Sequence, residues 1–220
     1  MSSGKRYKFN GSTFGVQTGL GASKTVTGIT NADPGVVSST AHGFVTGDVV
    51  ELSSIEGMTE VNGNLYAVDN EASGSFELAA TDTTDYGTFE AGSPADGIAR
   101  PVTFGSFCEL TGANQQDAGA DQIEVSTICS DAKEFEQGLS DSGTLQLDFN
   151  WAGNETVQAA LRTAKVSGDK LAFKVTFPGT GGFAIMIGTV QQTSFQGQVN
   201  GVWTASATIK LSGQVYVLAA

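Results

Sequence analysis

Residues 144–178 read TLQLDFNWAGNETVQAALRTAKVSGDKLAFKVTFP, and they carry the clearest structural signal in the chain. From 144 to 151 every second residue is apolar and the intervening ones are polar, which is typical of a strand with one buried and one open face. Residues 171–177 repeat this alternation. Between the two runs, four apolar residues recur at helical spacing: Val157, Ala160, Leu161 and Ala164. The stretch therefore predicts a strand, a short helix and a second strand.

The remainder of the chain extends this pattern. Asn154 is a candidate cap for the helix, and residues 167–169 (SGD) end it. Downstream, residues 183–190 and 203–211 alternate as strands, and residues 215–218 can form one more. Upstream, residues 104–110 and 122–128 read as shorter strands, with long polar loops at 111–121 and 129–143. The predicted class is all-β: a β-sandwich core with one short helix.

Residues 24–103 read as a small β domain of their own. Short apolar runs occur at 49–52, 65–68 and 76–78, with turn residues between them. Since core strands lie on both sides, we interpret the segment as an insertion into a core of residues 1–23 and 104–220. An insertion requires its two ends to be close together in space.

The formal charge of −12 is distributed unevenly. Residues 24–103 hold 12 acidic and 2 basic side chains, so the insert carries −10 and the core only −2. Within the core, residues 109–141 carry −7, residues 1–23 carry +3 and residues 142–220 carry +2. Because no basic patch is available to neutralise phosphates, direct nucleic-acid binding is disfavoured overall.

Compartment signals are sparse. No apolar run approaches the roughly 18 residues of a membrane helix, and we expect no membrane association. The basic start MSSGKRYKFNGS has no apolar stretch behind it, so we expect synthesis and assembly in cytosol. In that compartment Cys108 and Cys129 are expected to be buried free thiols, although a disulfide between them stays open.

The sequence gives no support for an enzyme. A Ser/His/Asp set would need His42, the one histidine, which lies in a turn-rich segment and is expected to be structural. Asp131, Glu134 and Glu136 form the densest acidic group outside the insert and read as a solvated loop. Residues 82–85 (DTTD) have too few ligands for a dedicated calcium loop. No P-loop, dinucleotide fingerprint or HExxH motif is present, and we expect no cofactor and no metal.

The core resembles the major tail proteins of long-tailed bacteriophages. The resemblance rests on LQLDFNW (145–151), a helix over 154–165, and GDKLAFKVTFP (168–178), because in that family a strand leads into a short helix, a GD turn and a strand ending in FP. The family has two later strands that residues 183–190 and 203–211 resemble. Before its first strand it has a segment similar to residues 130–143. The resemblance to the tail proteins covers residues 104–220, and residues 7–21 would be the N-terminal arm and first strand.

The insert resembles a different module. VVSSTAHGFVTGDVV (36–50) and GMTEVNG (57–63) are similar to a small β module that recurs in phage virion proteins and in the catalytic-cysteine half-domain of ubiquitin-activating enzymes. The resemblance extends through residues 76–78 and 86–87. Neither cysteine falls within it, so the activating-enzyme chemistry does not transfer.

The tail resemblance implies a subunit of a tail tube in the virion. Six copies would join one sheet into a barrel around a lumen that conducts DNA without specific binding, and rings would stack by self-assembly. The tape measure and tail terminator proteins are the further expected partners. The polar strand faces supply the lumen-facing candidates: Gln146, Asp148, Asn150, Thr204, Ser206 and Thr208. The insert is expected to project outward.

Charge asymmetry suggests how rings stack. The acidic loops of one ring would lie over a more basic face of the next, which makes Lys5, Arg6, Lys8, Asp131, Glu134 and Glu136 the inter-ring candidates. The alternative is a tail-tip or adhesin protein that binds host surface glycans. Exposed aromatic platforms would favour it, but Trp151 and Trp203 both fall on apolar strand faces.

Overall fold

The computed structural model describes residues 6–92, 96–117, 119–129, 131–139 and 141–218. It is mostly β, with one α-helix, α1 (Thr156–Ser167), and a short 3-10 turn at Thr59–Val61 in the described chain, so the predicted all-β class is confirmed. The strands are β1 (Thr13–Leu20), β2 (Lys24–Val26), β3 (Gly28–Ile29), β4 (Val36–Ser38), β5 (Val49–Ser53), β6 (Asn64–Ala72), β7 (Ser75–Leu78), β8 (Gly97–Ser106), β9 (Leu110–Gln116), β10 (Gln122–Glu124), β11 (Phe135–Gln137), β12 (Thr144–Asn150), β13 (Lys170–Thr176), β14 (Phe183–Gln196), β15 (Thr204–Leu211) and β16 (Tyr216–Leu218).

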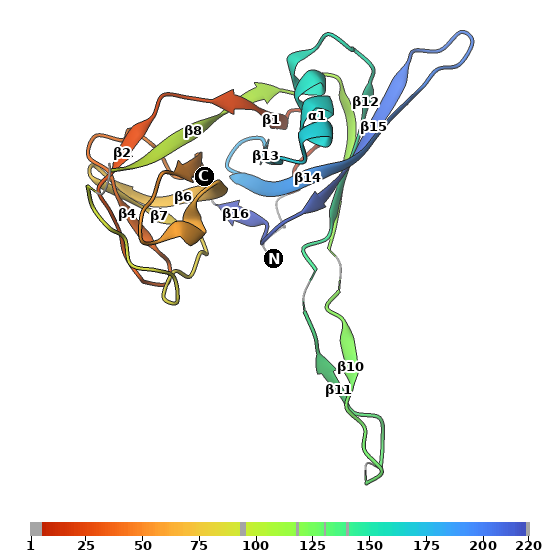
Figure 1. Cartoon of the computed structure of the whole chain (residues 1–220). Helices are drawn as coiled ribbons and strands as arrows, with labels where there is room; N and C mark the ends of the chain where they lie inside the picture. The colour runs from red at the N-terminus through yellow and green to blue at the C-terminus, as the bar shows by residue number, and fades with distance from the viewer. Residues whose placement is uncertain (1–5, 93–95, 118, 130, 140, 219–220) are drawn as a thin grey trace, which may run out of the picture.

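Within the described ranges fourteen strands form one sheet, and β10 pairs only with β11. The path of the large sheet runs β3-β4-β7-β6-β5-β8-β1-β13-β14-β15-β12-β9, with β16 and β2 attached to β14 and β8 (Figure 1). All its ladders are antiparallel. The strands expected at 144–151, 171–177, 183–190, 203–211 and 215–218 are therefore confirmed, with β14 running longer than expected.

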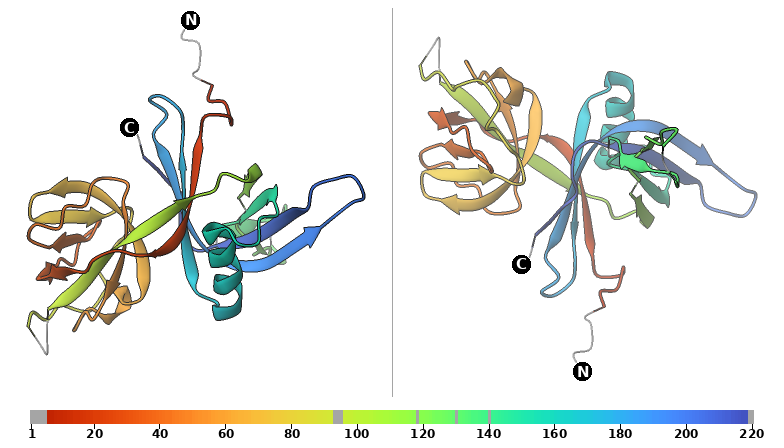
Figure 2. Two further views of the ribbon diagram at one scale, coloured as in Figure 1. Left: turned by 90° about the horizontal axis from the view of Figure 1, so that it is seen from above. Right: turned by 90° about the horizontal axis from the view of Figure 1, so that it is seen from below.

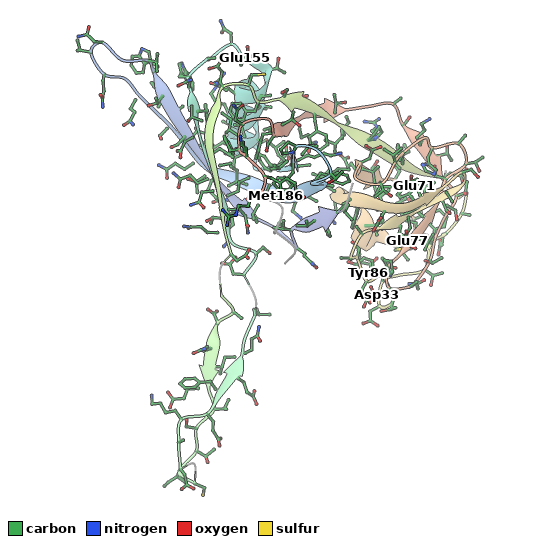
Figure 3. All side chains as sticks on the ribbon, turned by 180° about the vertical axis from the view of Figure 1, so that it is seen from behind. Asp33, Glu71, Glu77, Tyr86, Glu155 and Met186 are labelled. Carbon is green, nitrogen blue, oxygen red and sulfur yellow. The ribbon has the colours of Figure 1, made fainter. Side chains whose placement is uncertain are left out.

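The core lies between two halves of this sheet. Apolar residues of β1 and β13 (Phe14, Phe173) share one buried cluster with those of β12 and β15 (Leu147, Ile209) and with Leu161 of α1. Met186, labelled in Figure 3, belongs to the same cluster. The outer faces of the two halves consequently point in opposite directions, as in a sandwich.

The insert is continuous with the core through β8. The first half of this strand pairs with β2 and β5, and its second half pairs with β1. Lys24 lies opposite Ala99, so the two ends of the insert are close together in space. Because β8 crosses the predicted boundary at residue 103 without a break, the insert is attached by paired strands, not by a linker. Figure 2 shows it on the side of β1 and β13 away from the β14–β15 hairpin.

A second buried cluster joins the insert to the core. Val49, Leu65 and Ala67 of the insert pack with Ala172, Ile185 and Ile187 of β13 and β14. Lys174 adds a polar contact between the insert and the core. Its ammonium group donates to the Gly47 carbonyl at 2.7 Å and lies 4.6 Å from the centre of the Phe183 ring. Burial lowers the pKa of the Lys174 amine, and the Asp48 carboxylate opposes that shift. The insert is thus fixed on the outer face of the β13 half.

Because of this contact, we expect substitution of Gly47 to lower the stability of the chain strongly. Its φ is +88°, and an added Cβ would lie 2.0 Å from the Phe183 ring. We expect Gly47→Ala to destabilise the chain by about 2–5 kcal/mol, from the left-handed backbone together with overpacking. Gly63→Ala, at φ +69° with nothing within 4 Å, isolates the backbone cost. Thermal unfolding should show a clearly larger loss for Gly47→Ala; equal losses would contradict this junction.

Three expectations about the polar segments are wrong. The predicted strand at 104–110 is split, because β8 ends at Ser106 and β9 begins at Leu110. Most of the loop expected at 111–121 is strand β9, which pairs with β12 along its length, and the loop at 129–143 contains β11. Cross-strand pairing satisfies the backbone of a polar sequence as well as that of an apolar one, so composition concealed these strands.

The helix cap also differs from expectation. Helix α1 begins at Thr156 with Glu155 at the cap position and no side-chain cap bond, so Asn154 does not cap it. Instead Gln158, buried on the helix, accepts from Ala152 N–H at 3.0 Å and donates to the Asn150 carbonyl at 2.9 Å. Gly168 ends the helix at φ +79°, as the sequence predicts.

Candidate assembly surfaces

The six lumen-facing candidates lie together on one outer face of the sheet. Gln146 is opposite Thr208, Asp148 opposite Ser206, and Asn150 opposite Thr204, so they form three cross-strand pairs on β12 and β15. Residues directly opposite in an antiparallel ladder share a face. The rows continue onto β14, where Gln192, Ser194 and Gln196 pair with the same β15 residues. The Ser194 and Ser206 hydroxyls are 2.8 Å apart.

This polar face is almost uncharged. The paired residues 146–150 of β12, 192–196 of β14 and 204–208 of β15 include one ionisable side chain, Asp148. Lys210, one row further, is bound to Asp141. That ion pair and the Gly143 N–H lower the pKa of the Asp141 carboxyl. The face therefore offers hydroxyl and amide groups without a free cation near its centre.

The four neighbouring strands β9, β12, β15 and β14 have two open edges in the described chain. β9 ends the sheet path, with β12 as its one strand neighbour. At the other side, β13 pairs with β14 only as far as Thr189, so residues 190–196 pair with β15 alone. β9 runs antiparallel to β12, β12 to β15 and β15 to β14. A β9 edge placed against a β14 edge of another copy would consequently form an antiparallel pair.

A two-stranded ribbon extends from one end of this sheet. We call residues 117–143 the arm; it contains β10 and β11 and leaves the sheet between Gln116 and Thr144, which are cross-strand partners. None of its described residues from 119 to 139 is buried. Figure 1 and Figure 3 show the arm standing away from the rest of the chain. An isolated hairpin is marginally stable in water, so a free arm is an unfavourable arrangement.

The structure separates the inter-ring candidates into two places. Asp131, Glu134 and Glu136 all lie on the arm and are exposed, and Lys133 of the arm pairs with Glu124 at 3.1 Å. Arg6 and Lys8 are exposed in the segment before β1, while Lys5 lies outside the described residues. In Figure 2 the N-terminal segment leaves the molecule to one side, away from the arm. A contact between the two groups therefore requires two copies.

Two expectations about exposure are wrong. Cys108 and Cys129 are free, as expected, but both are exposed instead of buried, because they lie in the β8–β9 turn and on the arm. Trp203 is 55% exposed. Trp203 belongs to the same alternation as the buried Ala205 and Ala207. The last β12–β15 pair is Asn150 with Thr204, so Trp203 lies past the end of β12 and the core does not cover it.

His42 is buried, where its Nδ1 accepts from Phe44 N–H at 3.0 Å and its Nε2 donates to the Ala72 carbonyl at 2.8 Å, so the structural interpretation fits. Within the described ranges no three His, Cys, Asp or Glu side chains gather as metal ligands. Across those ranges the structure also contains no helix with the length and apolarity of a membrane span.

In class, this is an all-β protein whose candidate functional surfaces are strand faces, open edges and a protruding ribbon. Comparison with known families adds two identifications. Residues 98–182 match the family described as phage tail tube, TTP, lambda-like, and residues 33–103 match the ubiquitin-activating enzyme E1 FCCH domain. The core thus resembles lambda-like phage tail tube proteins and the insert an E1 FCCH domain, which confirms both resemblances. The two matches overlap on β8, the strand that the two parts share.

Individual relatives cover parts of the chain. The ubiquitin-like modifier-activating enzyme 1 of Oryctolagus cuniculus is 32% identical over 82 residues, which is 36% of this chain and 8% of that enzyme. Among solved structures, a chain of the tail of an empty GTA particle, computed with helical refinement and C6 symmetry, aligns with TM-score 0.44 and 14% identity. That alignment covers 52% of this chain and 86% of the other.

Proposed function

We propose that this protein is a structural, non-catalytic subunit of a bacteriophage tail tube, in which hexameric rings stack and conduct DNA through their lumen. The observation that carries the proposal is the four-stranded sheet of β9, β12, β15 and β14, which has one polar face and two open, antiparallel-compatible edges. The tail tube family match over 98–182 includes β9 and β12. In this role the protein belongs to the virion tail, assembled in the host cytoplasm.

Ring closure removes both edges at once. Open edges invite pairing with other chains, and a closed barrel has none. Four strands from each of six copies give 24 strands. With strands about 4.8 Å apart and tilted by about 40°, such a barrel measures about 48 Å across between backbones. After side chains are subtracted, the passage is wider than a DNA duplex.

The polar face suits this passage chemically. Cations would bind phosphates and retard the duplex, whereas hydroxyl and amide groups interact weakly with it. The face formed by Gln146, Thr208, Ser206 and Thr204 has no free cation near its centre. On this arrangement, the lumen-facing candidates stay those derived from the strand pattern.

The insert would project outward from the tube. Its contact lies on the outer face of the β13 half, and the outer faces of the two halves point in opposite directions. If the β12–β15 face lines the lumen, the insert is directed toward the outside. Tape measure and tail terminator proteins remain proposed partners of the assembled tube.

Stacking would use the acidic arm. We expect Glu134→Lys combined with Glu136→Lys to abolish tube polymerisation while the subunit stays folded, because the exposed arm would present the wrong charge to the next ring. Single exposed pairs contribute under about 1 kcal/mol, but a ring repeats them sixfold. Electron microscopy of the purified protein measures the outcome.

A matched control is Glu56→Lys with Glu90→Lys, which makes the same charge change at two exposed positions of the insert. This variant should form tubes like those of the unmodified chain. Normal tubes from the arm variant would refute the stacking role, and a dispersed monomer from the unmodified chain would refute the tube itself.

A further inference from the structure

The tip of the β14–β15 hairpin is an exposed apolar surface. Every residue from 194 to 203 is exposed, and four of them are large and apolar: Phe195 (61%), Val199 (94%), Val202 (71%) and Trp203 (55%). Residues 190–209 carry no charged side chain. Contiguous exposed apolar patches on soluble proteins mark interaction sites.

The base of this tip is held in a defined shape. The Phe195 ring stacks on Trp151 with centroids 5.0 Å apart, and Trp203 lies 5.9 Å from Phe195. The Arg162 guanidinium lies 5.0 Å from the Trp151 ring, and the backbone N–H of Trp151 donates to the backbone carbonyl of Trp203 at 2.8 Å. A surface that is ordered before binding loses little conformational entropy on association. The tip is therefore preorganised for a partner.

The position of the tip indicates which partner. It extends from the Asn150 end of the polar sheet, and the arm extends from the Thr144 end, so the two protrusions lie at opposite ends of the same strands (Figure 1). The arm also exposes apolar side chains: Ile123 (54%), Phe135 (52%) and Leu139 (89%). In a head-to-tail stack each tip faces the end of the next copy that carries the arm.

We propose that the tip of one copy docks onto the arm of a second copy in the adjacent ring. This inference rests on the stacked-ring function proposed above. The contact is heterologous, since two different patches meet, and such contacts propagate along an axis. It covers Val199 and Val202 together with Ile123 and Leu139, and the uncharged tip places no like charge against the acidic arm. Stacking aromatic rings alone would suit a glycan, but the two exposed valines favour an apolar protein surface.

Cross-linking tests the pairing directly in the full chain. Cys108→Ser and Cys129→Ser first remove the exposed native thiols. One batch then carries Val199→Cys and a second batch carries Leu139→Cys, and a short bis-maleimide is added to assembled tubes. Mixed tubes should give a covalent dimer that either batch alone does not give. Equal dimer yield from a single batch, or none from the mixture, would overturn the proposal.

A second variant tests the contribution of the tip to stacking. Val199→Glu with Val202→Glu should form rings but lose tubes longer than one ring, with thermal unfolding unchanged. Val166→Glu, on the exposed face of α1, is the control for a carboxylate at an exposed valine and should form full tubes.

The outcomes separate the two levels of inference. If the unmodified chain forms neither rings nor tubes, the tail tube function fails, and the docking falls with it. If the Val199→Glu, Val202→Glu variant forms tubes as long as those of the unmodified chain, the docking proposal is overturned and the tail tube function still stands. The same length with loss of binding to host cell-wall polysaccharide would assign the tip to a glycan instead.

Discussion

Tubes assembled from chains carrying Gln146→Lys and Thr208→Lys should retain double-stranded DNA at low salt, protect it from nuclease, and release it as salt is raised. Gln146 and Thr208 are cross-strand partners near the centre of the polar face. Six copies would add twelve cations to each ring of the proposed lumen. Unmodified tubes should retain no DNA under the same conditions, because their face has no free cation there.

The expected effect is large because phosphate binding is steeply salt-dependent. A protein that makes about six to ten phosphate contacts loses about three to five orders of magnitude in affinity between about 50 and 200 mM salt. Co-sedimentation of labelled duplex with tubes, followed by nuclease digestion across that salt range, measures both retention and enclosure.

The control places the same charge elsewhere. Thr163→Lys with Val166→Lys adds two cations at exposed positions of α1, which packs on the opposite face of the sheet. Those tubes can attract DNA to their outside, where nuclease digests it. Equal protection by both variants, or none by either with intact tubes, would exclude β12 and β15 as the lumen wall.

Removal of the arm should leave a folded subunit that cannot form tubes. Gln116 and Thr144 are cross-strand partners, so an Asn-Gly turn can replace residues 117–143 and close β9 and β12 as a tight hairpin. The described arm residues from 119 to 139 are not buried. The deletion also removes the exposed Asp141–Lys210 ion pair, which solvent screens, and the Gly143 carbonyl that accepts from Leu211 N–H, a hydrogen bond of about 1 kcal/mol. We therefore expect the melting temperature of the subunit to fall only slightly. Tube formation should be lost, because in the proposed stack the arm makes both the acidic and the apolar contacts to the next ring.

Circular dichroism, thermal unfolding and electron microscopy of the shortened chain check this expectation. Single rings without tubes would assign the arm to stacking alone. Normal tubes from the shortened chain would contradict every contact proposed for the arm, including its docking onto the β14–β15 tip.

Much of the core could be predicted from local pattern. Alternation in residues 144–151 and 203–211 predicts two-faced strands, and burial of Leu145, Leu147 and Ile209 confirms it. The position of Gln146 on one face with Thr208 follows from the same period of two once the strands pair. The helix and its glycine end were also predictable, because spacing and a left-handed residue act within a few positions.

Which strands pair, and where the buried core ends, depend on contacts between distant parts of the chain. The sequence of β9 is polar, and its identity as a strand comes from pairing with β12, which begins 28 residues after β9 ends. β8 joins the insert to the core because its two halves find different partners. Trp203 has the phase of a core residue yet stays exposed, since burial depends on what lies across from a side chain and not on its own alternation. Local periodicity therefore determined the faces of the strands, whereas long-range pairing determined the edges, the arm and the exposed tip.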